Sequence, residues 1–305
     1  MIPILCSIDK NFVMQFMVTA VSLFRNNAGE EFHVHLLHIH LDEATLEKIR
    51  TFVEDTHHQR ISFYDADEEL MHNEHIPQTG RFTLSTYMRC FVTRILPADI
   101  SKILYLDCDI LVRGSIRPLW DTDLEGCALG AVDDMWALRD KFERLQIPPA
   151  DSYFNNGVLL INLDFWRKID TYALSLDYIE KHHDRIIHHD QDVFNALFHD
   201  RRKALPVQFN MQDAFYRRRR QWIQPALLPA IDAALENPVI VHFTGSHKPW
   251  EYKCYHPFRK EYQRYIDLTP YKGYSEAPKK FSDRIETIIN PVLWTLHLAP
   301  RKYRM

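Results

Sequence analysis

The first 66 residues alternate between short apolar runs and amphipathic segments. The runs at 2–8, 31–39 and 60–66 are apolar and rich in β-favouring side chains, which predicts three strands. Segments 12–26 and 42–56 have helical character, the first from its apolar spacing and the second from an acidic first turn. This order predicts an α/β fold with a mainly parallel sheet, whose ligands bind beyond the carboxyl ends of the strands.

The same pattern continues to about residue 260 without internal repeats. It predicts helices at 83–96 and 189–199 and strands at 103–107, 127–134, within 153–166 and at 239–245. We therefore expect one domain over residues 1–260, followed by a separate tail over residues 261–305.

The C-terminal part of the chain differs from the rest in charge. Residues 246–305 hold 12 Lys and Arg against 6 Asp and Glu, whereas the whole chain has a net charge of −4. Residues 281–305 combine apolar side chains and a tryptophan with a basic end. This pattern fits an interfacial helix on a membrane surface and equally a terminal helix packed on the domain.

Composition excludes several classes of protein. The mild negative charge gives no indication of a nucleic-acid partner, and neither glycine-rich phosphate-binding motif is present. Five scattered cysteines without a C-x-x-C pair indicate free thiols in a reducing compartment. The N-terminus reads as a first strand rather than a signal peptide, and no apolar run is long enough to span a bilayer. These features predict a cytoplasmic location.

Two carboxylates, Asp107 and Asp109, interrupt the apolar run that starts at residue 102. Residues i and i+2 of a strand point to the same side, so both carboxylates can reach one point beyond the strand. Two anions at one point repel unless a cation lies between them, which indicates a divalent metal that carries a diphosphate. A turn or a cap would explain the same spacing without a metal.

Two residues near the end of the predicted strand 239–245 extend this hypothesis. His242 is either a hydrogen-bonded core residue or a third ligand, and an imidazole ligand favours Mn²⁺ while leaving Mg²⁺ as an alternative. Lys248 is either an exposed loop lysine or a point charge that contacts a phosphate.

Six motifs in order resemble the family 8 glycosyltransferases: SIDKNF, STYMRC, LYLDCDILVRGSIRPLWDTDLEG, FNNGVLLINLDFWR, HDQDVFNALF and VHFTGSHKPW. The resemblance covers about residues 1–260 and points toward the lipopolysaccharide galactosyl- and glucosyltransferases, with glycogenin more distant. It implies a Rossmann-like GT-A domain, a UDP-sugar donor, Mn²⁺, and transfer of glucose or galactose to a saccharide or glycolipid acceptor with retention of configuration.

The resemblance also implies a role for individual residues. The metal ligands would be Asp107, Asp109 and His242, with Asp107 also touching the donor. The uridine end would be held by Ser7, Asp9 and Asn11, and the diphosphate by Gly245 and Lys248. The donor sugar would be surrounded by Arg89, Asn155, Asn156, Asp190 and Gln191, with Asp134 on the acceptor side. By elimination rather than by resemblance, acceptor loops are expected within 67–82 and 135–152, which are irregular, charged and aromatic.

Catalysis would centre on Gln191 and Asp190. An amide is a poor nucleophile, so the resemblance favours displacement from the front face, assisted by the leaving phosphate. Asp190 has a simpler interpretation as a helix N-cap, Asn155 and Asn156 as turn residues, and Arg89 as the partner of a helix neighbour.

Other activities compete with sugar transfer. A nucleotide-sugar hydrolase or pyrophosphorylase could use the same D-x-D motif, and a binding module without activity could retain it. The missing glycine-rich loop argues against a pyrophosphorylase. This chain also departs from the family pattern at Lys10, Cys108 and Asn156, and Asn156 next to the sugar would affect donor choice.

Overall fold

The computed structural model describes residues 1–66, 84–136, 138–148 and 150–276, with isolated residues of the C-terminal tail. The expected acceptor loop 67–82 and most of the amphipathic segment 281–305 lie outside the described residues. No helix among the described residues has the length and apolar character needed to cross a bilayer.

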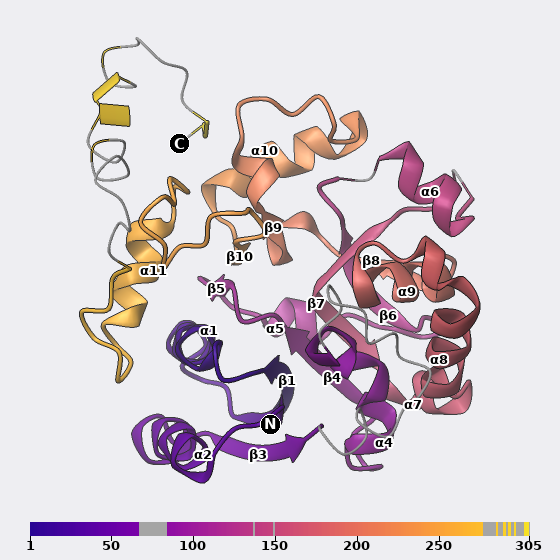
Figure 1. The fold of residues 1–305 in the computed structure, drawn as a ribbon, viewed down its shortest axis with the longest axis horizontal. Helices are drawn as coiled ribbons and strands as arrows, with labels where there is room; N and C mark the ends of the chain where they lie inside the picture. Colours follow the sequence, from indigo (N-terminus) through magenta and orange to yellow (C-terminus); the bar gives the residue numbers. More distant parts are fainter. Residues whose placement is uncertain are drawn as a thin grey trace.

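A seven-stranded sheet forms the centre of the molecule (Figure 1). Its strand order is β3-β2-β1-β4-β7-β6-β8, and all neighbouring strands pair in parallel except β7, which is antiparallel to β4 and β6. This confirms the predicted α/β fold with a mainly parallel sheet. The strands are β1 Ile2–Ile8, β2 Phe32–His38, β3 Arg60–Asp65, β4 Lys102–Leu106, β6 Leu129–Asp133, β7 Phe154–Asn162 and β8 Arg202–Ala204.

A second, three-stranded sheet has the order β5-β10-β9. Its strands are short: β5 Ile110–Val112, β9 Met211–Gln212 and β10 Ile240–His242. The chain leaves β4 of the large sheet and enters β5 of the small one through residues 107–109, so the D-x-D motif joins the two sheets.

The described α-helices are α1 Val13–Asn26, α2 Glu43–Arg50, α4 Val92–Ile95, α5 Arg117–Trp120, α6 Arg139–Leu145, α7 Leu163–Lys168, α8 Thr171–His182, α9 His189–Phe198, α10 Leu228–Glu236 and α11 Arg259–Ile266. Buried residues of α1 pack against one face of the large sheet, and those of α7, α8 and α9 pack against the other. A π-helical turn, Thr51–Thr56, continues α2, and short 3₁₀ segments occur at Leu84–Phe91, His183–Arg185, Val207–Phe209, Asp213–Tyr216 and Pro225–Leu227.

One predicted element differs from the one observed, and another is confirmed with narrower bounds. The segment expected as one helix over 83–96 is a 3₁₀ segment followed by the single turn of α4. The apolar run 153–166 is a strand only as far as Asn162, because the Asn162 side chain accepts a hydrogen bond from Phe165 N (3.0 Å) and caps α7.

Helix α1 fixes the position of the link between the sheets. Nearly all of it is buried, and its Thr19 hydroxyl donates to the carbonyls of Cys108 (3.2 Å) and Ile110 (3.0 Å). Ser22 Oγ accepts from Val112 N (3.0 Å) on β5. These bonds satisfy buried backbone groups that no sheet ladder reaches, so the D-x-D link is held in one conformation.

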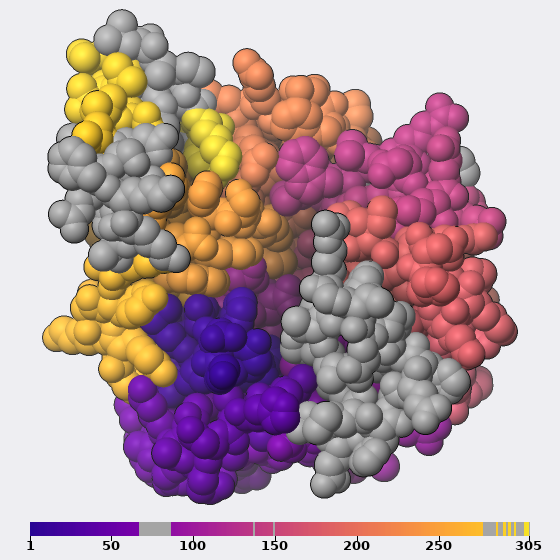
Figure 2. Space-filling view, in the orientation of Figure 1, coloured from indigo at the N-terminus to yellow at the C-terminus, as the bar shows by residue number. Residues whose placement is uncertain are grey.

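The C-terminal residues return to the body of the molecule. Helix α11 contacts α1, and Asn26 Nδ2 donates to Tyr265 OH (2.7 Å); Figure 2 shows these N-terminal and C-terminal segments adjoining on one face. Farther along, Tyr303 forms an isolated antiparallel bridge with Arg217 and donates to Asp213 Oδ1 (2.6 Å). The division of the chain at residue 260 stays a prediction.

Candidate functional site

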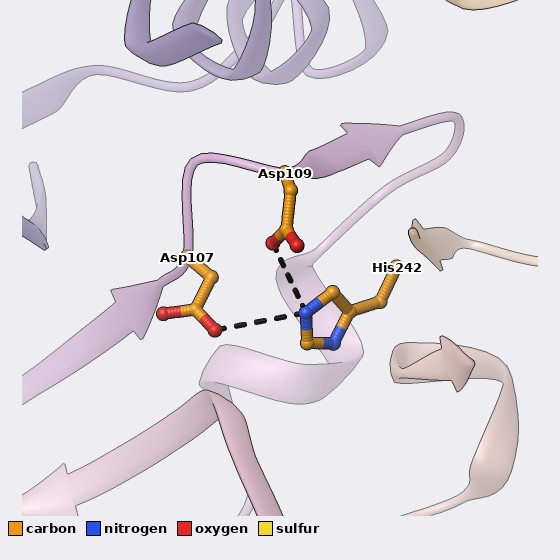
Figure 3. A group of neighbouring side chains, drawn as sticks. All are labelled: Asp107, Asp109 and His242. Atoms are coloured by element: carbon orange, nitrogen blue, oxygen red, sulfur yellow. Dashed lines mark ion pairs between the residues drawn. The ribbon is translucent and has the colours of Figure 1, made fainter. Parts of the chain in front are cut away.

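The two carboxylates of the D-x-D motif converge with His242. Asp107 follows β4 and Asp109 precedes β5, and both side chains point toward the imidazole at the end of β10 (Figure 3). His242 Nε2 lies 3.1 Å from Asp109 Oδ1 and 3.6 Å from Asp107 Oδ2. Three residues separated by up to 135 positions in the sequence thus meet at one point. The D-x-D spacing predicted the approach of the two carboxylates, and the family resemblance implied the third residue.

This trio fits a divalent cation. One ligand atom from each residue lies within 4.8 Å of the other two, so a single ion can contact all three. His242 Nδ1 is hydrogen-bonded to Asn210 Oδ1 (2.9 Å), which leaves Nε2 as the nitrogen that faces the carboxylates. Two carboxylates and an imidazole lone pair directed at one point are compensated best by a metal ion.

Lys248 completes this group, which we call the carboxylate cluster: Asp107, Asp109, His242 and Lys248. The Lys248 ammonium donates to Asp109 Oδ2 and to the Phe243 carbonyl, both at 2.7 Å, and is not an exposed loop lysine. Burial opposes ionisation of Asp109, but Lys248 and His242 outweigh it and hold the pKa of Asp109 well below its usual value. Asp109 is therefore an anion at neutral pH.

Two glycines allow this packing. A Cβ on Gly157 of β7 would overlap the His242 ring and lie 2.6 Å from Asp107 Oδ2. A Cβ on Gly245 would lie 2.7 Å from Asp213 Oδ1. Only glycine leaves room for the metal-facing side chains at the first position and for the loop after β10 at the second.

Arg89 connects the D-x-D motif to α9. Its Nε atom pairs with Asp190 (2.5 Å), its Nη1 atom lies 3.6 Å from Asp107, and its guanidinium lies over the Tyr105 ring. Tyr105 OH donates to Asp107 Oδ1 (2.6 Å) and is bonded to Ser7 Oγ (3.1 Å). Burial raises the pKa of Asp190 despite the opposing effect of Arg89.

Four buried or half-buried amides lie beside the carboxylate cluster, and we call Asn155, Asn156, Asn210 and Gln191 the amide cluster. Gln191 Oε1 accepts from Asn155 Nδ2 and from the backbone N–H of Asn156, both at 3.3 Å. Gln191 Nε2 donates to Tyr153 OH (3.0 Å) and to Asp134 Oδ2 (3.4 Å). The predicted sugar-side and acceptor-side residues are thus joined in one network.

The network ends in two buried ion pairs. Asp134 Oδ1 accepts from Lys141 Nζ (2.9 Å), and Asp192 Oδ2 accepts from Arg144 Nη1 (2.8 Å). Tyr153 OH donates to Asp192 Oδ1 (2.8 Å), so this carboxylate also fixes the hydroxyl that Gln191 contacts.

A cavity of about 250 Å³ opens beside the carboxylate cluster. Its lining includes five of the predicted site residues: Ser7, Asp9, Arg89, Asp107 and Asp109. Asn11 does not line the cavity but lies two residues after Asp9, which does. It is exposed, and its backbone N–H donates to Asp9 Oδ1 (2.8 Å). A larger cavity, about 380 Å³, lies at the opposite ends of the strands and includes none of the selected residues.

Simpler interpretations of two residues are wrong in this structure. Asp190 is not the N-cap of α9, because His188 occupies that position and Asp190 pairs with Arg89. Arg89 accordingly has its partner on α9 rather than on its own segment.

Sequence reasoning missed Tyr105, Tyr153, Gly157 and Asn210. Gly157 lies in the FNNGVLLINLDFWR motif, but a single sequence does not reveal that its lack of a side chain makes room for the His242 ring. Asn210 lies between short elements that have no clear apolar period, so no pattern drew attention to it.

Comparison with known proteins places this geometry in a family. The model of Glycosyl transferase family 8 matches residues 3–254. The chain is 30% identical to General stress protein A of Bacillus subtilis (strain 168) over 68% of this chain and 73% of that protein. It is 24% identical to the lipopolysaccharide 1,2-glucosyltransferase of Escherichia coli (strain K12) over 92% of this chain and 81% of that protein.

Among solved structures, the fold matches galactosyltransferase LgtC in complex with donor and acceptor sugar analogues. The TM-score is 0.79 at 27% identity, covering 92% of this chain and 99% of that one. A second LgtC structure, of an active-site mutant with glutamate in place of a glutamine, gives a TM-score of 0.77 at 25% identity, covering 93% and 100%.

Proposed function

Because the chain belongs to glycosyl transferase family 8, we propose that it is a retaining hexosyltransferase that moves glucose or galactose from a UDP-sugar to a saccharide acceptor. One observation carries the proposal: Asp107, Asp109 and His242 converge beside a cavity and next to the hydrogen-bonded amide cluster. The glucosyltransferase and galactosyltransferase relatives support a hexose and a role in lipopolysaccharide or another surface glycan.

The metal-binding role falls to Asp107, Asp109 and His242. Two carboxylates and an imidazole favour Mn²⁺, with Mg²⁺ the weaker alternative because imidazole suits it poorly. When bound, the ion would neutralise the charge that grows on the leaving nucleoside diphosphate. Lys248 adds a second positive charge beside the metal site. Its ammonium donates two of its three hydrogens to Asp109 and the Phe243 carbonyl, so the third would be available to a phosphate oxygen.

The remaining residues would bind the two substrates. Ser7, Asp9 and Asn11 would hold the uridine end in the cavity, and Gly245 would let the loop after β10 approach the diphosphate. Arg89, Asn155, Asn156 and Asp190 would surround the hexose, with Asp134 toward the acceptor. These residues form one hydrogen-bonded or ion-paired group around Gln191 and Arg89, which Asn156 joins through its backbone N–H and carbonyl. This arrangement supports a single sugar pocket.

Gln191 would stabilise the sugar as its glycosidic bond breaks. Its Oε1 already accepts two hydrogen bonds and belongs to an amide, so it is a weak nucleophile. Asp190 is tied to Arg89, which lowers its availability for attack. We therefore propose displacement from the front face, and the active-site glutamine of LgtC supports a central place for Gln191.

We also propose that the tail holds the protein at the cytoplasmic face of a membrane, where a glycolipid acceptor would lie. Ile285, Ile289, Val292 and Leu296 are exposed, and their spacing of four, three and four residues is that of one helix face. Lys302 and Arg304 follow. All five cysteines are free, in keeping with a reducing compartment. Sedimentation with anionic vesicles should fall when residues after 280 are deleted; unchanged sedimentation would disprove the anchor.

The experiment that tests the function is UDP release from a panel of nucleotide sugars, with Mn²⁺ or with EDTA. We expect release from UDP-glucose or UDP-galactose that EDTA abolishes and that Asp109→Asn lowers by about a thousandfold. Asp164→Asn, at a carboxylate whose side chain is 69% exposed, is the matched control and should leave turnover unchanged. Release that persists in EDTA would contradict the proposal. Acceptor-independent release at the full rate would indicate the hydrolase instead.

A further inference from the structure

The orientation of the buried amides can be deduced from one backbone group. Gly157 N–H, which can only donate, points at Asn155 Oδ1 (3.0 Å), so this atom is an acceptor. Asn210 lies 2.9 Å from the same atom, so Asn210 must present its NH₂ group there. The other end of the Asn210 amide is therefore its carbonyl oxygen.

That oxygen fixes the tautomer of His242. Asn210 Oδ1 lies 2.9 Å from His242 Nδ1, so Nδ1 carries the hydrogen and donates it. In the neutral imidazole, Nε2 then carries the lone pair, and this atom faces Asp109 and Asp107 at 3.1 and 3.6 Å. Asn210 is completely buried, so bulk water does not reach its hydrogen bond to His242.

The same amide chain reaches the sugar side. Asn155 Nδ2 donates to Gln191 Oε1, and the backbone N–H of Asn156 donates to that oxygen as well. Gln191 must therefore direct its NH₂ group at Tyr153 OH and Asp134. Strand β7 thus orients two amides through Asn155: that of Asn210 next to His242 and that of Gln191.

We propose that Asn210 is a positioning residue that holds His242 Nε2 toward the metal ion and, through Asn155, holds the Gln191 amide in register with it. This inference rests on the proposed function, in which His242 binds metal and Gln191 contacts the sugar. Metal-binding histidines generally depend on the partner of their second nitrogen, and loss of that partner costs about 10- to 100-fold in affinity.

Two substitutions separate the two halves of this role. Asn210→Leu removes the acceptor for His242 and the donor for Asn155, so we expect Mn²⁺ affinity without nucleotide to fall by about 10- to 100-fold. Asn210→Asp keeps an acceptor for His242 Nδ1 but places an oxygen opposite Asn155 Oδ1. We expect Mn²⁺ affinity within about threefold of the parent protein and turnover at least about tenfold lower, with the donor KM little changed.

Gln212→Leu is the matched control. Gln212 is also a fully buried amide on the same segment, but it bonds Met135 N and Asp133 O rather than His242. It should lose stability as Asn210→Leu does and keep the Mn²⁺ affinity of the parent protein.

The measurements are Mn²⁺ binding by electron paramagnetic resonance and the imidazole ¹⁵N shifts of His242, both without nucleotide. The parent protein should show the Nδ1–H tautomer. An Nε2–H tautomer, or Mn²⁺ affinity equal in Asn210→Leu and the parent, would overturn the proposal. If Asn210→Leu does not fold, equal turnover of Asn210→Asp and the parent would overturn the link to Gln191. Because metal binding needs no sugar donor, these results stand apart from any failure to find UDP release.

Discussion

The carboxylate cluster and the amide cluster meet at Asn210, and they differ in charge and in exposure. Asp107 and Lys248 carry formal charges, and their side chains remain 30% and 26% exposed. Asn155, Asn156 and Asn210 carry no charge and are buried. Under the proposed function, the first cluster is open to an ion and a diphosphate from solvent, whereas the second is shielded from it.

Two aspartates show the same contrast in their ionisation. Burial opposes the charge of both, yet Lys248 and His242 lower the pKa of Asp109, while Arg89 does not prevent the pKa of Asp190 from rising. Charged neighbours thus decide the direction of the pKa shift at Asp109, in the carboxylate cluster. Desolvation decides it at Asp190, next to the amide cluster. Substitutions on the two sides should therefore change different measured quantities.

Gly157→Ala should have the largest effect, because it strikes the point where the clusters touch. Its Cβ would overlap the His242 ring and lie 2.6 Å from Asp107 Oδ2, so both ligands must move. We expect Mn²⁺ affinity without nucleotide to fall at least about tenfold, and turnover with it. Gly29→Ala, where a Cβ meets no atom within 4 Å, is the control. Parent-like Mn²⁺ binding in Gly157→Ala would mean that the two ligands need not hold their positions.

Tyr153→Phe should change the amide side alone. It removes the hydroxyl that accepts from Gln191 Nε2 and donates to Asp192, at a cost of about 1–2 kcal/mol in positioning, or roughly a tenfold loss of kcat. Donor KM and Mn²⁺ affinity should stay unchanged in steady-state and binding assays.

Tyr216→Phe provides the comparison for that experiment. Tyr216 is equally buried, and its hydroxyl has no hydrogen-bond partner among the described residues, so its removal should leave kcat unchanged. An equal loss of kcat in both variants would show that Tyr153 acts only through packing.

The last prediction concerns stability rather than turnover, at the support beneath the carboxylate cluster. His256 packs edge-on against Phe243, the neighbour of His242, and burial lowers the pKa of His256 to about 3. The unfolded chain binds a proton there below about pH 6.5 and the folded chain does not. The free energy of unfolding should therefore fall as the pH drops from about 6.5 toward 3, by up to ~1.4 kcal/mol per pH unit.

His256→Asn should reduce that slope, because asparagine keeps an acceptor for Phe258 N and does not titrate in this range. Urea unfolding in EDTA at pH 7, 6 and 5 measures the slope without any contribution from bound metal. Equal slopes in the variant and the parent would show that His256 does not govern the acid sensitivity of this region.

The two clusters also differ in how far the sequence predicts them. Asp107 and Asp109 follow a strand that its apolar run reveals, and His242 is the last residue of another, so the position of each at a strand end is predictable. Their meeting is not predictable from strand order, because β4 belongs to the large sheet and β10 to the small one. The large sheet is predictable, since β1, β2 and β3 each have a clear apolar run. Glycosyltransferase character came from motifs that match a family rather than from spacing.

The amide cluster was only partly predictable. Asn155, Asn156 and Gln191 lie in motifs, but their hydrogen-bond directions depend on the backbone of β7, which one sequence does not reveal. Asn210 lies next to β9, a strand of two residues that pairs with β10 across a long stretch of chain. Strands this short carry no usable period, and long-range pairing sets their place.

The most direct test of the account is a crystal structure of the protein grown with Mn²⁺ and UDP, with an anomalous difference map collected at the manganese edge. We predict one strong peak bound by Asp107, Asp109 and His242 Nε2, with diphosphate oxygens on its open side. A map in which manganese lies elsewhere, or in which His242 faces the ion with Nδ1, would contradict it.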